Sequence, residues 1–168
     1  MIDIGTAIRH YKRKDIQEEI IYGSQNREVV AKFGDNFGRR PDILKYPKDI
    51  LELAQMGATS FHASEELWSY PLRLSPMMGK AEIDDIRIGW DLVLDIDCAF
   101  LEYSRIAADE IIKRLRTRGV SSISIKFSGN KGFHIGIPFE AFPEKISGKD
   151  AKAMFPEAAR TVAACIKE

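Results

Sequence analysis

The sequence has few cysteines, no excess of charge of either sign and no long apolar run. Its 168 residues include two cysteines, Cys98 and Cys165, neither of them in a Cys-x-x-Cys pair. Two reduced thiols are therefore expected rather than a disulfide or a zinc site. Lysine and arginine together number 25, as do aspartate and glutamate. This balance argues against a broad basic surface for non-specific nucleic-acid binding but allows a local basic groove.

No segment has the pattern of an export signal or a membrane span. Residues 1–5 contain no basic segment followed by a long apolar run. No apolar stretch reaches the roughly 20 residues that a membrane-spanning helix needs. We therefore expect a cytoplasmic protein without a membrane partner. The length allows one domain with its own core, here spanning residues 1–168, with an N-terminal extension over about 1–85.

The first half of the sequence predicts a small α/β extension. Charged residues with apolar positions at helical spacing predict a surface helix over 7–22. Pro47 and Gly57 mark the start and the end of a second helix, over 47–55. Short strands are expected over 27–33 and 58–63, with a turn-rich stretch over 34–41 that contains Arg39 and Arg40.

The second half, about residues 86–168, predicts an α+β core. Its expected elements are a buried strand over 90–96, a helix over 101–118, strands over 122–127 and 133–139, and a last helix from about Asp150. This βαββα order begins a ferredoxin-like or RRM-like fold, which needs one more strand. The sequence ends where that strand should begin. We therefore expect either a piece of a longer chain or a sheet edge that something else covers.

Asp95 and Asp97 lie two residues apart at the end of the apolar run. Alternate residues of a strand point to one face, so both carboxylates should project together. Hard ions such as Mg²⁺ prefer such oxygen ligands, with substrate phosphates completing the shell. A carboxylate pair of this kind holds the ions of two-metal phosphoryl transfer. The alternative is a strand that runs into an acidic loop, with both side chains solvated.

The segment Ser128-Gly129-Asn130-Lys131-Gly132-Phe133-His134 has the parts of a triphosphate-binding hairpin. Its glycines allow backbone N–H groups to approach an anion, Ser128 supplies a hydroxyl and Lys131 a compact positive charge. His134 begins the returning strand and can donate to a phosphate oxygen. The Walker pattern of phosphate-binding loops is absent. The alternative is an ordinary glycine-rich hairpin with a partly exposed histidine.

Taken together, these two motifs resemble those of the archaeo-eukaryotic primase superfamily. Its first motif is an apolar strand ending in Asp-x-Asp, here 94–97, and its second is Ser-Gly-x-Arg/Lys-Gly-aromatic-His, here 128–134. Weaker similarity to the catalytic small subunit extends over about 7–168. It includes Arg27-Glu28-Val29, an arginine at Arg39 or Arg40, and the segment 57–61.

The resemblance implies a primase small-subunit-like fold and a template-directed DNA primase, which makes primers from nucleoside triphosphates. It implies that Asp95 and Asp97 are catalytic and bind Mg²⁺ or Mn²⁺. Ser128, Gly129, Lys131 and His134 would bind the nucleotide, with Arg40 and Glu28 in supporting roles. A DNA template and a primase large subunit are the implied partners. The family also uses a third carboxylate on a later strand, and no matching apolar-Asp segment follows His134.

Three other functions fit parts of the same pattern. An end-joining repair polymerase of the superfamily would carry the same motifs. An RRM-like module could bind nucleic acid without catalysis, although such modules place aromatic side chains on their central strands. A shortened, inactive relative could still bind nucleotide. The side chains of His10, His62, Phe61, Trp68 and Tyr70 are expected in core or surface roles rather than as ligands.

Overall fold

The computed structural model, which describes residues 3–167, is an α+β protein with small antiparallel sheets. The chain forms two compact units, Met1–Ile88 and Gly89–Glu168. The division lies close to the boundary expected near residue 85 between the extension and the core. Within residues 3–167, no helix combines the length and the apolar character that crossing a bilayer requires.

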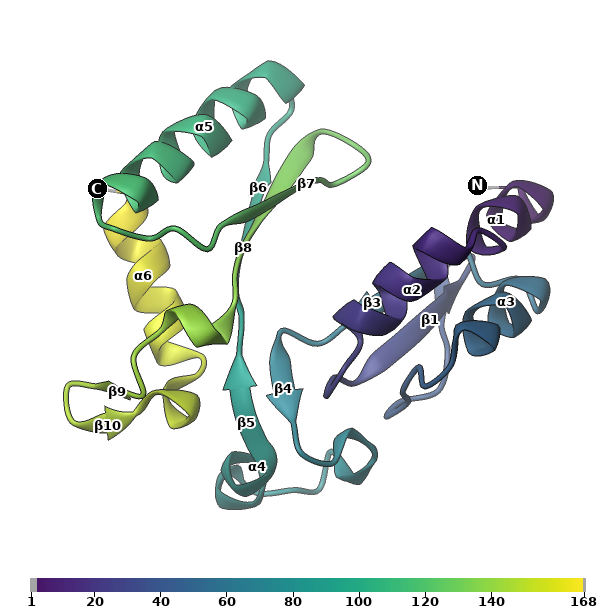
Figure 1. The fold of residues 1–168 in the computed structure, drawn as a ribbon, viewed down its shortest axis with the longest axis horizontal. Helices are drawn as coiled ribbons and strands as arrows, with labels where there is room; N and C mark the ends of the chain where they lie inside the picture. Colours follow the sequence, from purple (N-terminus) through teal and green to yellow (C-terminus); the bar gives the residue numbers. More distant parts are fainter. Residues whose placement is uncertain (1–2, 168) are drawn as a thin grey trace. The chain divides into compact units, whose positions relative to one another are not determined.

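The first unit packs helices against a three-stranded sheet of order β2-β1-β3 (Figure 1). Its elements are α1 (Ile4–Tyr11), α2 (Lys14–Gly23), β1 (Val29–Phe33), β2 (Asn36–Phe37), α3 (Pro47–Gln55), β3 (Ser60–Ala63), β4 (Glu66–Trp68) and α4 (Lys80–Ile86). The core gathers Ala7 and Tyr11 of α1, Val29 of β1, and Ile50 and Ala54 of α3. The predicted start and end of the helix at Pro47 and Gly57 are confirmed, because Pro47 is the first residue of α3 and Gly57 follows it with φ +103°.

The single helix predicted over residues 7–22 is wrong, because two helices occupy this segment. They are separated at Arg13, whose backbone is extended. The apolar positions explain the break: Tyr11 and Ile16 are five residues apart, a spacing that a continuous helix does not place on one face. Breaking the helix lets both apolar residues reach the same core cluster. The Tyr11 hydroxyl also donates to the Thr59 carbonyl at 3.0 Å, which fixes the end of α1.

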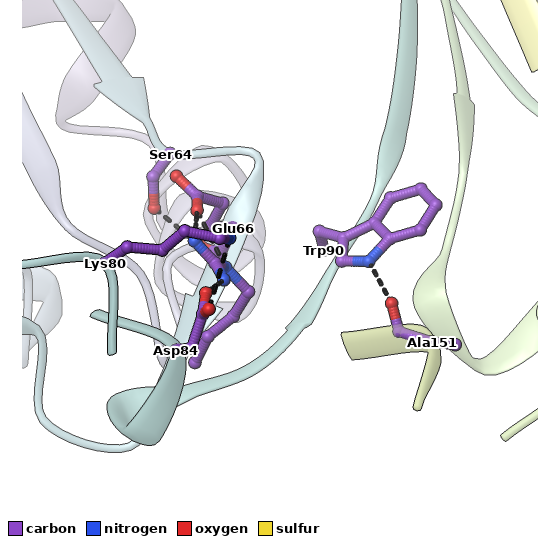
Figure 2. Close-up of polar contacts among 7 residues, drawn as sticks. Ser64, Glu66, Lys80, Asp84, Trp90 and Ala151 are labelled. Carbon is purple, nitrogen blue, oxygen red and sulfur yellow. Dashed lines mark hydrogen bonds and ion pairs between the residues drawn. The ribbon is translucent and has the colours of Figure 1, made fainter. Parts of the chain in front are cut away.

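A buried arginine organises the end of the first unit, and Figure 2 labels its two acidic partners, Glu66 and Asp84. Arg87 is 5% exposed and donates to the carboxylates of Glu66 and Asp84. Its guanidinium also lies over the ring of Trp68, 5.4 Å from the ring centre. A buried charge is tolerated only when it is paired, so the two carboxylates hold Arg87 at this position.

The second unit is built on the sheet β6-β8-β7 (Figure 1). Its elements are β6 (Leu92–Asp97), α5 (Leu101–Thr117), β7 (Ser124–Phe127), β8 (Gly132–Ile137), β9 (Lys145–Ile146), β10 (Lys149–Asp150) and α6 (Glu157–Lys167), preceded by β5 (Arg87–Trp90), which begins in the first unit. Both β6 and β7 run antiparallel to β8. The predicted hairpin is therefore confirmed, and β8 takes the central place between two strands that α5 connects.

Both helices of the second unit cover the same face of this sheet. Ala108 and Leu115 of α5 and Ala158 of α6 join Leu92 and Ile135 in one core cluster. Trp90 belongs to the same cluster and is fully buried, and its indole N–H donates to the Ala151 carbonyl at 2.8 Å (Figure 2). The opposite face of the sheet is left uncovered by α5 and α6, and it carries the polar side chains of the three strands.

Two predicted bounds in the second unit need correction. The strand expected over 90–96 is interrupted at Asp91, whose side chain accepts a hydrogen bond from the Phe139 N–H at 3.0 Å. The last helix begins at Glu157 rather than near Asp150. A proline disfavours helical backbone in the residue before it, and Phe155, which precedes Pro156, is extended with ψ 137°.

Candidate functional site

Asp95 and Asp97 both lie on β6 and project from the uncovered face of the sheet. Their side chains are exposed, whereas Leu94 and Ile96 are half-buried and pack against the core. Residues two apart on a strand are separated by about 7 Å. At that distance in water, two carboxylates repel each other by only about 0.6 kcal/mol. The fold therefore tolerates the pair without a bound ion, and both carboxylates are open to an ion from solvent.

His134 is the direct neighbour of Asp95 across the sheet. The register of β6 and β8 places Asp95 opposite His134, and His134 Nε2 lies 3.4 Å from Asp95 Oδ1. The register of β7 and β8 places Lys126 on the other side of His134. Directly opposed residues share a face, so these three side chains form a line across all three strands. We call Asp95, His134 and Lys126 the charged row.

The hairpin loop adjoins the charged row at the end of β8. The Ser128 hydroxyl oxygen accepts hydrogen bonds from the Gly132 N–H at 3.1 Å and the Asn130 N–H at 3.4 Å. It therefore braces the loop and keeps its own O–H free to donate. Gly129 has φ +91°, a conformation that favours glycine. Lys131 is exposed at the tip of the loop.

Gly132 is required by a close approach of two backbones. It lies opposite Asp97, and a Cβ atom added to it would sit 2.2 Å from the Ile96 carbonyl oxygen. No side chain fits there without moving β6 or β8. The glycine of the second motif thus lets β8 lie directly against the strand that carries the two aspartates.

An open depression of about 570 Å³ lies on the same face beyond the charged row. Lys126 and His134 line one end of it. Its middle is formed by Val93, Gly136 and Ser124, which the register places side by side across the three strands. We call these three residues the glycine row. The depression can therefore hold a molecule with an anionic end at the charged row and an uncharged part over the glycine row.

A divalent ion at Asp95 and Asp97 would need ligands from outside the chain. Within residues 3–167, no three histidine, cysteine, aspartate or glutamate side chains gather closely enough to hold a metal by themselves. Mg²⁺ is commonly bound by one or two carboxylates, and water and phosphate oxygens complete its coordination shell. The exposed donor set on β6 fits this ion type.

Glu28 and Arg40, the two sequence-predicted site residues of the first unit, are paired with each other. Arg40 Nε and Nη2 donate to the two oxygens of Glu28 at 2.7 and 2.8 Å. Their hydrogen bonds and charge attraction raise the pKa of Arg40 above its usual value. With His62 and Phe37, they line a depression of about 200 Å³ within this unit. Their role in nucleotide binding stays a prediction.

Sequence reasoning missed Lys126 as a site residue. The alternation Ser124, Lys126, Ser128 along one strand was a usable signal, because these residues share a face with one another. What the sequence could not give is the neighbour across the sheet. The pairing of Lys126 with His134 depends on the register of the hairpin.

The comparisons with known proteins supply little independent information. No protein-family model matches the chain. The uncharacterized protein MJECS07 of Methanocaldococcus jannaschii is 43% identical to it over 61 residues. The match covers 36% of this chain, and it spans 14% of the length of that archaeal protein.

Proposed function

We propose that this chain carries the nucleotide- and metal-binding part of a template-directed nucleotidyltransferase of the archaeo-eukaryotic primase type. One observation carries the proposal: the two carboxylates of β6, the histidine of β8 and the glycine hairpin lie on one uncovered face of one sheet. The βαββα order supports an RRM-like or ferredoxin-like core with a primase small-subunit-like arrangement. Nucleoside triphosphates and a DNA template are the proposed substrates.

Each residue has a distinct role in the proposed chemistry. Asp95 and Asp97 would hold Mg²⁺ or Mn²⁺, and the bound ion would supply charge neutralisation at the triphosphate and at the attacking oxygen. His134 and Lys131 donate to phosphate oxygens, and the free O–H of Ser128 can do the same. A 3′-hydroxyl attacks the α-phosphate in line, the new phosphodiester bond forms, and pyrophosphate leaves. Positioning and fixed positive groups supply most of the rate increase in such a site.

The uncovered face favours this proposal over a base-stacking RRM-like module. Its nine strand and hairpin positions within the described residues hold no phenylalanine, tyrosine or tryptophan; they are Val93, Asp95, Asp97, Ser124, Lys126, Ser128, Gly132, His134 and Gly136. RRM modules depend on aromatic side chains at such positions to stack bases. Carboxylates there would also repel a nucleic-acid backbone unless a cation lies between them.

Metal-dependent nucleotide binding tests the proposal on the chain itself. We expect wild-type protein to bind Mn²⁺ together with ATP, with the Mn²⁺ signal followed by electron paramagnetic resonance. Mutating a residue that only orients a metal ligand typically lowers metal affinity by roughly 10–100-fold. Asp95→Asn or Asp97→Asn changes a proposed ligand itself, so either should lower the affinity for Mn²⁺ by at least this factor. Asp85→Asn is the matched control, because Asp85 is exposed on α4 of the first unit and belongs to neither motif.

Two further measurements extend this test. His134→Ala should weaken ATP binding about tenfold through the loss of one charge-assisted hydrogen bond. Where nucleotide addition to a primer is observed, Asp95→Ala should abolish it. Mn²⁺ and ATP binding that is the same in wild type, Asp95→Asn and Asp97→Asn would refute the proposed function.

A further inference from the structure

The uncovered sheet face has a charged part at its hairpin end and an uncharged part in its middle. At the hairpin end lie Asp97 and Ser128, followed by the charged row of Asp95, His134 and Lys126. The glycine row, Val93, Gly136 and Ser124, comes next and carries no charge. The depression begins at Lys126 and His134 and continues over the glycine row toward Pro138 and Asp91, whose carboxylate accepts a hydrogen bond from the Phe139 N–H.

Gly136 creates the hollow at the centre of this face. It lies on the middle strand, between Val93 and Ser124, so a side chain there would stand in the middle of the depression. A Cβ atom added to Gly136 would meet one atom within 4 Å, the Ser124 hydroxyl oxygen at 2.7 Å. The rest of the space above Gly136 is open. The hollow therefore depends on glycine at this position, and a larger residue is prevented by a single hydroxyl.

Lys126 supplies a positive charge that neither sequence motif includes. It is exposed on β7, next to His134, and lies across His134 from Asp95. A cation bound at Asp95 and Asp97 would draw phosphate oxygens toward β6, and Lys126 would meet the same phosphates from the β7 side. An ammonium group suits this task, because it donates to phosphate oxygens as a compact charge on a flexible stem.

We propose that Lys126 is a further phosphate-binding residue and that the depression over the glycine row receives the sugar and base of the nucleoside triphosphate. This inference rests on the proposed function, because it assigns the substrate to the same face. Charge decides the orientation. The anionic tail lies at the charged row and the hairpin, and the uncharged part of the nucleotide lies over Val93, Gly136 and Pro138.

Two ligands test the phosphate part and the nucleoside part of this proposal separately. Mg²⁺-ATP contains both parts of the substrate, whereas inorganic tripolyphosphate with Mg²⁺ contains only the anionic tail. Binding of each to the whole chain is measured by titration calorimetry at fixed ionic strength. Lys126→Gln should weaken the binding of both ligands about tenfold, since each loses one charge-assisted hydrogen bond. Lys126→Arg should keep most of the affinity, and Lys149→Gln, an exposed lysine on β10, should not change it.

Filling the hollow tests the nucleoside half. The double variant Gly136→Val with Ser124→Ala places an isopropyl group in the depression and removes the one atom that it would strike. It should weaken ATP binding by about tenfold or more and leave tripolyphosphate binding unchanged, because only the sugar and base lose contact area. Ser124→Ala alone is the matched control. Far-UV circular dichroism checks that each variant keeps the β6-β8-β7 sheet.

The outcomes are distinguishable. If wild-type protein binds neither ligand, the proposed function fails and this inference fails with it. Wild-type binding of both ligands with unchanged affinities in Lys126→Gln and in the double variant would leave the function standing and overturn the inference. Equal weakening of ATP and tripolyphosphate by the double variant would overturn the assignment of the depression to the nucleoside.

Discussion

Gly132→Ala should separate the two strands that carry the candidate site. A Cβ atom at residue 132 would lie 2.2 Å from the Ile96 carbonyl oxygen and 3.2 Å from its carbon. Carbon and oxygen atoms that are not bonded stay more than about 3.0 Å apart, so the two backbones must move by roughly 0.8 Å. The contact is with backbone rather than with a flexible side chain. The movement therefore cannot be absorbed by a change of rotamer.

The size of the effect follows from what this movement breaks. Adding a methyl group where there is no room costs typically 1–3 kcal/mol. The neighbouring hydrogen bonds of the β6–β8 ladder are stretched at the same time, at about 1 kcal/mol each. We expect the free energy of unfolding to fall by about 2–4 kcal/mol. The site should suffer as well, because Asp97 moves away from the hairpin.

Urea unfolding followed by circular dichroism measures this change. Gly23→Ala is the control, because Gly23 ends a helix and a Cβ atom there meets nothing within 4 Å. Its free energy of unfolding should stay equal or rise by up to about 1 kcal/mol. Equal stabilities for Gly132→Ala and wild type would show that β6 and β8 do not approach as described, and the geometry of the site would have to be abandoned.

Three further predictions concern the stability of the two units. Trp90→Phe removes the indole donor to the Ala151 carbonyl and some ring volume, and urea unfolding should show a loss of about 2 kcal/mol. Partial burial alone would raise the pKa of Asp84, but its hydrogen bonds with Arg87 and Lys80 lower that pKa below 3.8. Its contribution to stability is therefore present above about pH 4 and lost as the pH falls through the lowered value, so Asp84→Asn should show a smaller acid-induced loss in unfolding experiments between pH 5 and 2. The buried Ser104 hydroxyl has no hydrogen-bond partner among the described residues. Ser104→Ala should therefore leave the free energy of unfolding unchanged or raise it by up to about 1 kcal/mol, and the thermal midpoint should not fall.

Several elements could be predicted because their signals lie within a few residues of each other. Pro47 and Gly57 start and end α3 through their own backbone preferences. The apolar stripe of α5 and the alternation in β7 and β8 likewise need only neighbours along the chain. Two of the errors had local signals that were misread, the five-residue spacing of Tyr11 and Ile16 and the proline at Pro156. The third lies at Asp91, whose side chain accepts a hydrogen bond from the Phe139 N–H, 48 residues away.

The sequence by itself determined which chemical groups are present and which of them share a face within one strand. Asp95 and Asp97 had to project together, because side chains alternate along any strand. Only the tertiary structure decided that His134 lies opposite Asp95, that Lys126 lies beyond it and that Gly136 leaves a hollow between Val93 and Ser124. Lys126 and Ser124 take their places from the register of the β7–β8 hairpin, and Asp95 and Val93 take theirs from the register between β6 and β8, which α5 separates in sequence. That register is set by the burial of Leu92, Ile135 and Ile137 under the helices, and a slip of one residue would turn the charged row toward the core.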